Sequence, residues 1–110
     1  MIGHVAGAQY MFCAMALGEK LSAEGDIEKT KTTKADLVKA LRESSTYCKR
    51  AYAQTDAAAG GTVDVFGEKR TRLFALMMNM GHDNEHYGNI VTYMRSNGMV
   101  PPSSKPPAGR

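Results

Sequence analysis

A long stretch with helical periodicity, residues 68–97, sets the main limit on how this chain can fold. Its predicted inner positions recur at spacings of four, four, four and three: Met78, His82, His86, Ile90 and Tyr93. The pattern stops at Gly98, and Pro101-Pro102 follow it. A helix of about 30 residues spans roughly 45 Å, longer than an average globular helix. Such a helix buries its apolar face best against neighbours of similar length, which favours a helical bundle.

Two further segments are predicted to be long helices. Residues 1–19 are rich in Ala and Met, with apolar positions at three-to-four spacing: Val5, Ala8, Phe12, Met15 and Ala16. Thr33 followed by Asp36 resembles a capping box before a second helix over residues 34–58, which Gly60-Gly61 end. The predicted inner positions of this helix are Leu37, Val38, Leu41, Ser44 or Ser45, Cys48, Tyr52 and Thr55. The expected fold is therefore an all-α, up-down bundle with three long helices, about 1–19, 34–58 and 68–97.

The remaining segments are expected to be connectors. Residues 20–31 form a polar connector, and Gly3 and Gly7 leave room for another backbone beside the first helix. Residues 62–66 alternate apolar and polar side chains as a strand does, but no second strand is evident, so an extended loop packed on the bundle is predicted. One domain is expected over residues 1–100, with a Pro/Ser-rich tail over residues 101–110 that is mobile beyond its first residues.

Charge and cysteine content narrow the function classes. The formal net charge is +3, but without Lys105 and Arg110 the chain has 12 basic against 11 acidic residues, so nucleic acid is not an expected partner. Cys13 and Cys48 lie 35 positions apart without Cys-x-x-Cys spacing, and we expect both to be reduced and buried. Residues 1–17 are apolar but contain polar side chains and lack a basic leader region. We expect a cytoplasmic protein with no membrane partner.

The histidines carry the strongest chemical signal. His82 and His86 lie one turn apart on the third helix, so two imidazoles can bind one ion from the same side. The one other histidine of the chain, His4, lies on the apolar side of the first helix. It can supply a third nitrogen if the first and third helices are neighbours. Three neutral imidazoles leave an open position on a divalent ion, where the pKa of a bound water or thiol falls.

Each of these residues also has a structural alternative. A single inward histidine is commonly a hydrogen-bonded core residue, and His-x-x-x-His also arises by chance. Asp83 and Glu85 flank the histidines and could orient an imidazole or act as a base, although a solvated surface charge is the more common role. Imidazole suits zinc, nickel, copper and iron alike, so the ligand type does not choose the metal.

Two segments carry a resemblance to a known family: HVAGAQYMF at residues 4–12 and GHDNEHYGNIVTYMRSNGMVPPSS at residues 81–104. They resemble the DinB-like superfamily, metal-binding four-helix bundles that include thiol-dependent S-transferases and relatives of maleylpyruvate isomerase. The resemblance implies that His4, His82 and His86 hold a divalent metal, zinc or nickel, and that a low-molecular-weight thiol takes part. Asn89 occupies a position where glutamine is commoner in the family. Family members have a helix before the one that carries the first histidine, so this chain is expected to lack it.

Two functions follow as expectations. The first is a metal-dependent transferase or hydrolase that activates a small thiol or water for an unidentified small-molecule substrate. Glu85 is its first candidate for the catalytic base, Asp83 is another, and Tyr87 or Tyr93 are more remote candidates. The second is a non-catalytic, metal-stabilised bundle that binds a small ligand or serves as an assembly module. Three helices leave an apolar groove open, so we expect completion by a missing N-terminal helix or by self-association, most simply as a dimer.

Overall fold

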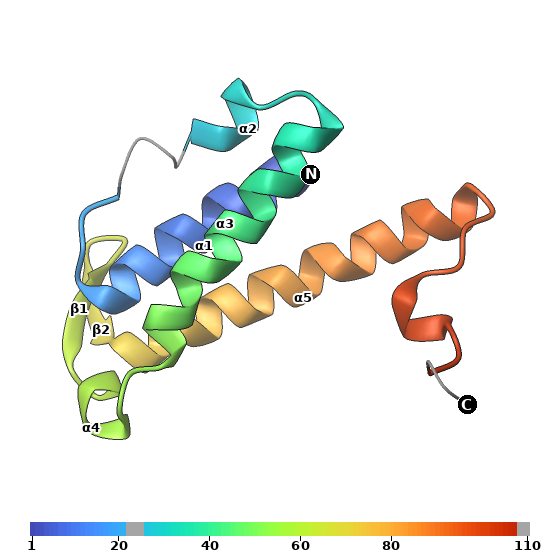
Figure 1. Ribbon diagram of the computed structural model, residues 1–110. Helices are drawn as coiled ribbons and strands as arrows, with labels where there is room; N and C mark the ends of the chain where they lie inside the picture. The colour runs from blue at the N-terminus through green and yellow to red at the C-terminus, as the bar shows by residue number, and fades with distance from the viewer. Residues whose placement is uncertain (22–25, 108–110) are drawn as a thin grey trace.

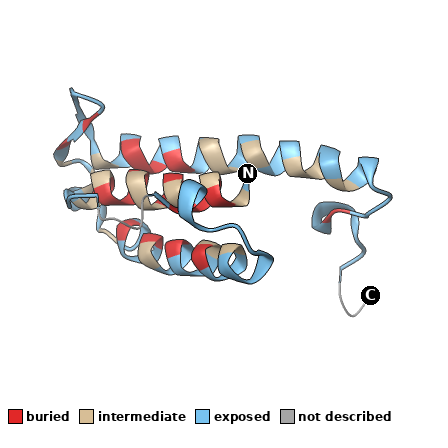
Figure 2. Ribbon diagram, turned by 90° about the horizontal axis from the view of Figure 1, so that it is seen from above, coloured by how far each residue is buried: buried red, intermediate tan, exposed pale blue. Residues whose placement is uncertain are grey.

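The computed structural model describes residues 1–21 and 26–107, and three long helices dominate it (Figure 1). The central one, α1, packs on the other two, which lie on different sides of it (Figures 1 and 2). The long helices are α1 (Ile2–Leu17), α3 (Lys34–Tyr52) and α5 (Arg72–Ser96). The shorter elements are α2 (Ile27–Thr30), α4 (Asp56–Ala59), β1 (Thr62–Val65), β2 (Glu68–Thr71) and the 3-10 helix η2 (Pro102–Ser104). The predicted all-α bundle is thus confirmed.

The helix α1 is buried on most of its circumference because it has a neighbour on either side. Its buried residues are Gly3, Val5, Ala6, Ala8, Gln9, Phe12, Cys13, Ala14 and Ala16. Small side chains predominate among them, which lets the neighbouring helices approach closely. The helix ends at Gly18, whose φ of 71° is left-handed, and the N–H groups of Gly18 and Glu19 donate to Met15 and Ala14 carbonyls. This is a glycine C-cap that satisfies the last carbonyls of the helix.

The contact between α1 and α3 corrects the expectation for the cysteines. Cys13 and Cys48 are buried as predicted, but they are not free thiols: a disulfide joins them, with an S–S distance of 2.03 Å and Cα atoms 5.4 Å apart. Helix packing brings the two residues together, which their sequence spacing cannot show. Close to this cross-link, buried Gln9 donates through Nε2 to Ser44 Oγ at 2.8 Å. The α1–α3 contact is therefore held covalently and by a buried hydrogen bond.

The helix α3 begins where the sequence predicts and ends earlier. The Asp36 N–H donates to Thr33 Oγ1 at 3.1 Å, so Thr33 is the N-cap. The helix ends at Tyr52, and Thr55 instead caps the separate short helix α4 by accepting from the Ala58 N–H at 3.1 Å. Of the predicted inner positions, Ser44 and Cys48 are buried, whereas Val38, Ser45, Tyr52 and Thr55 are exposed. Ala40 and Ala51 are the other buried residues of this helix.

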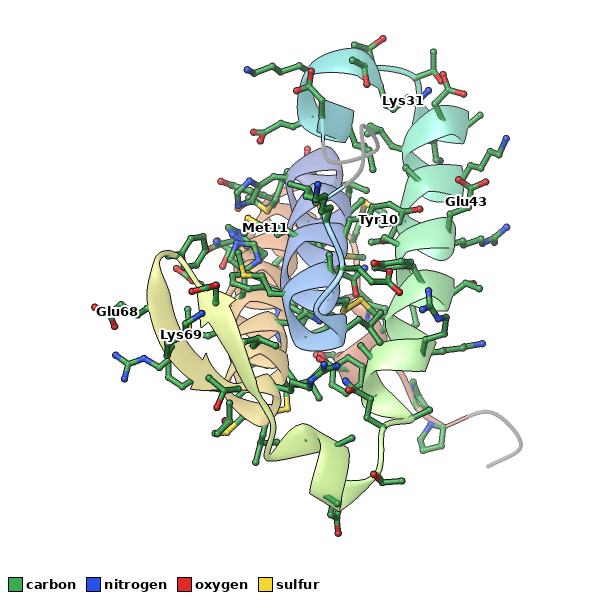
Figure 3. The ribbon with its side chains drawn as sticks, turned by 90° about the vertical axis from the view of Figure 1, so that its left-hand side faces the viewer. Tyr10, Met11, Lys31, Glu43, Glu68 and Lys69 are labelled. Carbon is green, nitrogen blue, oxygen red and sulfur yellow. A yellow bond between two sulfur atoms is a disulfide. The ribbon has the colours of Figure 1, made fainter. Side chains whose placement is uncertain are left out.

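The prediction of an extended loop at residues 62–66 is wrong, because β1 pairs with β2 in an antiparallel hairpin. The paired residues run from Thr62 with Thr71 to Val65 with Glu68. The two-residue turn, Phe66 and Gly67, has positive φ at both positions, 50° and 83°, as a type I′ hairpin turn requires. Val63, Val65 and Phe66 were all expected to pack on the bundle, and the two valines do so, but Phe66 in the turn is exposed. In Figure 3, Glu68 and Lys69 extend from the hairpin, and both are exposed.

The helix α5 begins at Arg72 instead of residue 68, since the hairpin takes the preceding residues and Thr71 caps the helix by accepting from the Phe74 N–H at 3.0 Å. Its buried residues, Ala75, Leu76 and Asn79, are all in the N-terminal half, and the C-terminal half extends beyond α1 and α3 (Figure 2). The predicted inward positions Met78 and Tyr93 are exposed. The strip that neighbours cover on α5 is narrower and shorter than its periodicity suggested.

The first residues of the tail fold back onto α5. Pro101 is buried, the Ser103 N–H donates to the Tyr87 hydroxyl at 3.2 Å, and Arg95 donates to Ser104 Oγ at 3.0 Å. The last residues of the predicted mobile tail, 108–110, and residues 22–25 of the predicted connector lie outside the described residues. Within the described part of the chain, no helix combines the length and the apolar character needed to cross a membrane.

Candidate metal centre

The structure brings the three predicted histidines together. His4 comes from the first turn of α1, and His82 and His86 come from successive turns of α5. The Nε2 atom of His82 lies 3.0 Å from Nε2 of His4 and 3.2 Å from Nε2 of His86. One ring nitrogen of each residue lies within 4.8 Å of the other two. These three residues are called the histidine triad, and His4 and His82 are separated by 78 positions in the sequence.

The spacing of these nitrogens fits a single metal ion. Two imidazole nitrogens bound tetrahedrally to zinc at about 2.0–2.1 Å lie about 3.3 Å apart, close to the observed 3.0 and 3.2 Å. A hydrogen-bonded chain fits less well, because His82 Nε2 faces both other Nε2 atoms. A ring nitrogen carries either one proton or one in-plane lone pair, so it can satisfy only one such neighbour. A shared cation satisfies all three lone pairs at once.

Burial favours the form of His82 that binds metals. Burial lowers the pKa of His82 below its ordinary value, and the neighbouring His86 and His4 lower it further, while Glu85 acts in the opposite direction. The aromatic ring of Phe12, a buried α1 residue, lies 5.8 Å from the His82 ring between centroids. The imidazole of His82 is thereby kept neutral at neutral pH, with a lone pair available for an ion.

The second ring nitrogens of the triad have different surroundings. His4 Nδ1 lies 3.3 Å from Glu28 Oε2, which comes from α2, and His86 Nδ1 lies 3.3 Å from the Asn89 side-chain amide. With the proton of neutral His86 on Nδ1, the Asn89 amide accepts it through its oxygen after a half-turn of the amide group. His82 Nδ1 is buried and has no hydrogen-bond partner among the described residues. The sequence did not point to Glu28, because it lies in the predicted polar connector.

The candidate bases are all residues of α5. Glu85 is exposed and lies close enough to His82 for its charge to favour the protonated imidazole. Asp83 is half-buried, and burial raises the pKa of its carboxyl group. Tyr87 is engaged by the backbone of Ser103, and Tyr93 is exposed. Among these candidates on α5, Glu85 is therefore the carboxylate whose side chain is exposed to solvent near His82.

A small pocket of about 180 Å³ adjoins the centre on one side of α1. It is lined by Gly3, His4, Gly7, Ala8, Met11, Leu21 and Glu28. In Figure 3, Met11 lies on one side of α1 and Tyr10 on the side of α3, where the Tyr10 ring meets that of Tyr47 with centroids 5.3 Å apart. The pocket is open and mostly apolar, with His4 and Glu28 as its titratable groups.

The sequence matches the family model of the DinB superfamily over residues 1–90. The chain belongs to the DinB superfamily. The matched region contains the whole histidine triad, all of α1, and α5 as far as residue 90. Comparisons of this DinB superfamily chain with curated proteins and with solved structures gave no match. Family membership and the three convergent histidines together are compatible with a protein that binds a divalent metal.

Proposed function

We propose that this DinB superfamily protein is a divalent-metal-dependent enzyme, a transferase or hydrolase, in which His4, His82 and His86 hold zinc or nickel. The observation that carries the proposal is that Nε2 of His82 lies 3.0 Å from Nε2 of His4 and 3.2 Å from Nε2 of His86, although the three residues come from two different helices. A metal bound by three neutral imidazoles with an open position would polarise a small thiol or a water molecule. Family membership supports the proposal independently of the geometry.

The residues of the chain have separate roles in the proposed reaction. The triad binds through Nε2, and the partly buried, neutral His82 offers its lone pair without first losing a proton. Phe12 keeps water from one side of the His82 ring. Glu85 accepts the proton from the thiol or water, because it is exposed and carries charge next to the triad. The open apolar pocket beside His4 would receive a small substrate.

A non-catalytic assembly module is the second candidate, and one surface of α5 favours it. Leu73, Met77 and Met80 are 51%, 57% and 61% exposed, and their spacing of four and three is that of a seam between helices. No charged side chain interrupts this apolar seam, so two identical copies can face each other without repulsion between like charges. We therefore propose a two-fold dimer through the apolar seam, in which the metal stabilises each bundle.

Metal content tests the proposed function. Protein purified without chelator and then offered zinc or nickel should contain about one metal ion per chain by elemental analysis. His4→Ala, His82→Ala and His86→Ala should each lose stoichiometric binding, whereas Asn84→Ala, a change at an exposed position of α5, should retain it. A wild-type protein that stays empty would refute the metal site, provided it is folded.

Two measurements on the loaded protein separate the two candidates. A metal with an exchangeable ligand, together with little change in Tm on chelation, supports the enzyme. A metal with no exchangeable ligand, together with a large fall in Tm on chelation, supports the structural role. Turnover of a small thiol or ester substrate that disappears in all three histidine variants would support the enzyme directly.

A further inference from the structure

The contact between Glu28 and His4 carries an inference that rests on the proposed metal site. We infer that Glu28 is a positioning residue: its carboxylate holds the proton of neutral His4 on Nδ1 and thereby directs Nε2 toward the ion. The observation is that both ring nitrogens of His4 have a partner: Nδ1 lies 3.3 Å from Glu28 Oε2, and Nε2 lies 3.0 Å from His82 Nε2. A carboxylate that accepts from the distal ring nitrogen fixes both the tautomer and the orientation of a ligating histidine.

His4 needs such a partner more than the other two histidines do. His82 and His86 share α5, so helical geometry alone places their rings one turn apart. His4 comes from another helix, and its ring must be turned toward α5 by a contact made from elsewhere. Glu28 supplies this contact from α2, across a sequence separation of 24 residues. The nitrogen that completes the triad is therefore oriented by an element that belongs to neither ligand-bearing helix.

The packing of α2 shows why Glu28 reaches His4. Buried Ile27 anchors α2 against Ala6 of α1 and Ala40 of α3. Gly3 provides the space for this approach, since a Cβ atom at Gly3 would lie only 3.2 Å from the Glu28 Cα. The expectation that another backbone comes close to Gly3 is thus met by α2. A glycine next to the ligand lets the backbone of Glu28 pass close enough for its side chain to reach the ring.

Exposure distinguishes positioning from a role in folding. The side chains of His4 and Glu28 are 41% and 65% exposed, so water screens the interaction and its contribution to fold stability is small. Loss of Glu28 should therefore weaken metal binding and leave the stability of the metal-free fold nearly unchanged. A purely structural contact would give the reverse.

Zinc titration of purified protein with Glu28 variants tests the inference. Glu28→Ala should bind zinc about 10- to 100-fold more weakly than wild type. Glu28→Gln should lose less affinity, because its amide oxygen still accepts from Nδ1–H. Glu43→Ala is the matched control, since Glu43 is an exposed glutamate of α3 whose partner is Lys39. Unchanged zinc affinity in Glu28→Ala would overturn the inference while leaving the proposed metal site intact.

Imidazole ¹⁵N NMR of the metal-free protein gives a readout that does not need metal or activity. At about pH 8, where histidine is neutral, wild type and Glu28→Gln should show His4 mainly as the Nδ1–H tautomer. Glu28→Ala should shift His4 toward the Nε2–H tautomer that an unconstrained imidazole prefers. The same tautomer in wild type and Glu28→Ala would refute positioning by Glu28. A wild type that binds neither zinc nor nickel would instead refute the proposed function.

Discussion

Reduction of the Cys13–Cys48 disulfide should lower the free energy of unfolding by about 4 kcal/mol. The two cysteines lie 35 residues apart. In the chain-entropy model, a cross-link that closes a loop of this length removes about 13 cal/mol/K from the unfolded chain, which is about 3.8 kcal/mol at 25 °C. Since the total stability of a domain is about 5–15 kcal/mol, the disulfide accounts for a large share of it.

Urea unfolding followed by circular dichroism, with and without a phosphine reductant, measures this effect. The double variant Cys13→Ala/Cys48→Ala is the control, because its unfolding curve should not respond to reductant. Thiol titration of the untreated, unfolded wild type should find no free thiol. Two free thiols in that titration, or an unfolding free energy that reductant does not change, would refute the reasoning.

Three further predictions concern the proposed base, the partly buried Tyr47 and the apolar seam. Glu85→Gln should abolish the turnover found for wild type and keep its metal; unchanged turnover or lost metal would exclude Glu85 as the base. Burial and a hydrogen bond to Glu19 raise the pKa of Tyr47 to about 12. The stabilisation from neutral Tyr47 is therefore full below about pH 10 and is lost as the pH rises to about 12. Phenolate absorbance should show a titration step at this high pH that Tyr47→Phe removes. A step that persists in Tyr47→Phe would contradict this assignment. In sedimentation at micromolar concentration, wild type should be a dimer and Met77→Lys a monomer, and a monomeric wild type would exclude the dimer.

The histidine triad was predictable because much of its geometry is local. A four-residue spacing on a helix sets the relative positions of His82 and His86 whatever surrounds them. The same periodicity failed for Met78 and Tyr93, which are exposed. Periodicity shows which residues share a helix face, but the width and the length of the surface that α1 covers decide which of them are buried. Met78 lies close in sequence to buried Leu76 and Asn79, so the covered strip is too narrow to include it, whereas Tyr93 lies near the C-terminal end of α5. Here α1 has only 16 residues against 25 in α5, so much of the longer helix lies beyond its reach.

The hairpin and the disulfide could not be derived from sequence patterns in the same way. All four residues of β2 are exposed, so the strand has no apolar alternation to reveal it. Its turn uses Phe66 with positive φ before Gly67, in place of the Asn-Gly pair that usually marks such a turn. The disulfide depends on α1 and α3 lying side by side, which is tertiary information. The Cys13 and Cys48 positions indicated burial only.

Glu28 was missed for a related reason. Its contact with His4 joins residues 24 apart through a four-residue helix inside a polar stretch, and no periodic pattern marks it. The available signal was the glycine before His4. A residue without a side chain next to a candidate ligand indicates that another chain segment comes close there. The polar connector, residues 20–31, contains charged side chains that could make such a contact.

The central position of α1 has a thermodynamic consequence. This helix is tied to α3 by the disulfide at Cys13 and would be tied to α5 by a metal at His4, so both restraints limit the freedom of the same 16 residues. If the disulfide strengthens metal binding by some factor, bound metal must shift the thiol–disulfide equilibrium toward the disulfide by the same factor. The protein would then report the redox state of its surroundings as metal occupancy, and metal supply as resistance to reductant.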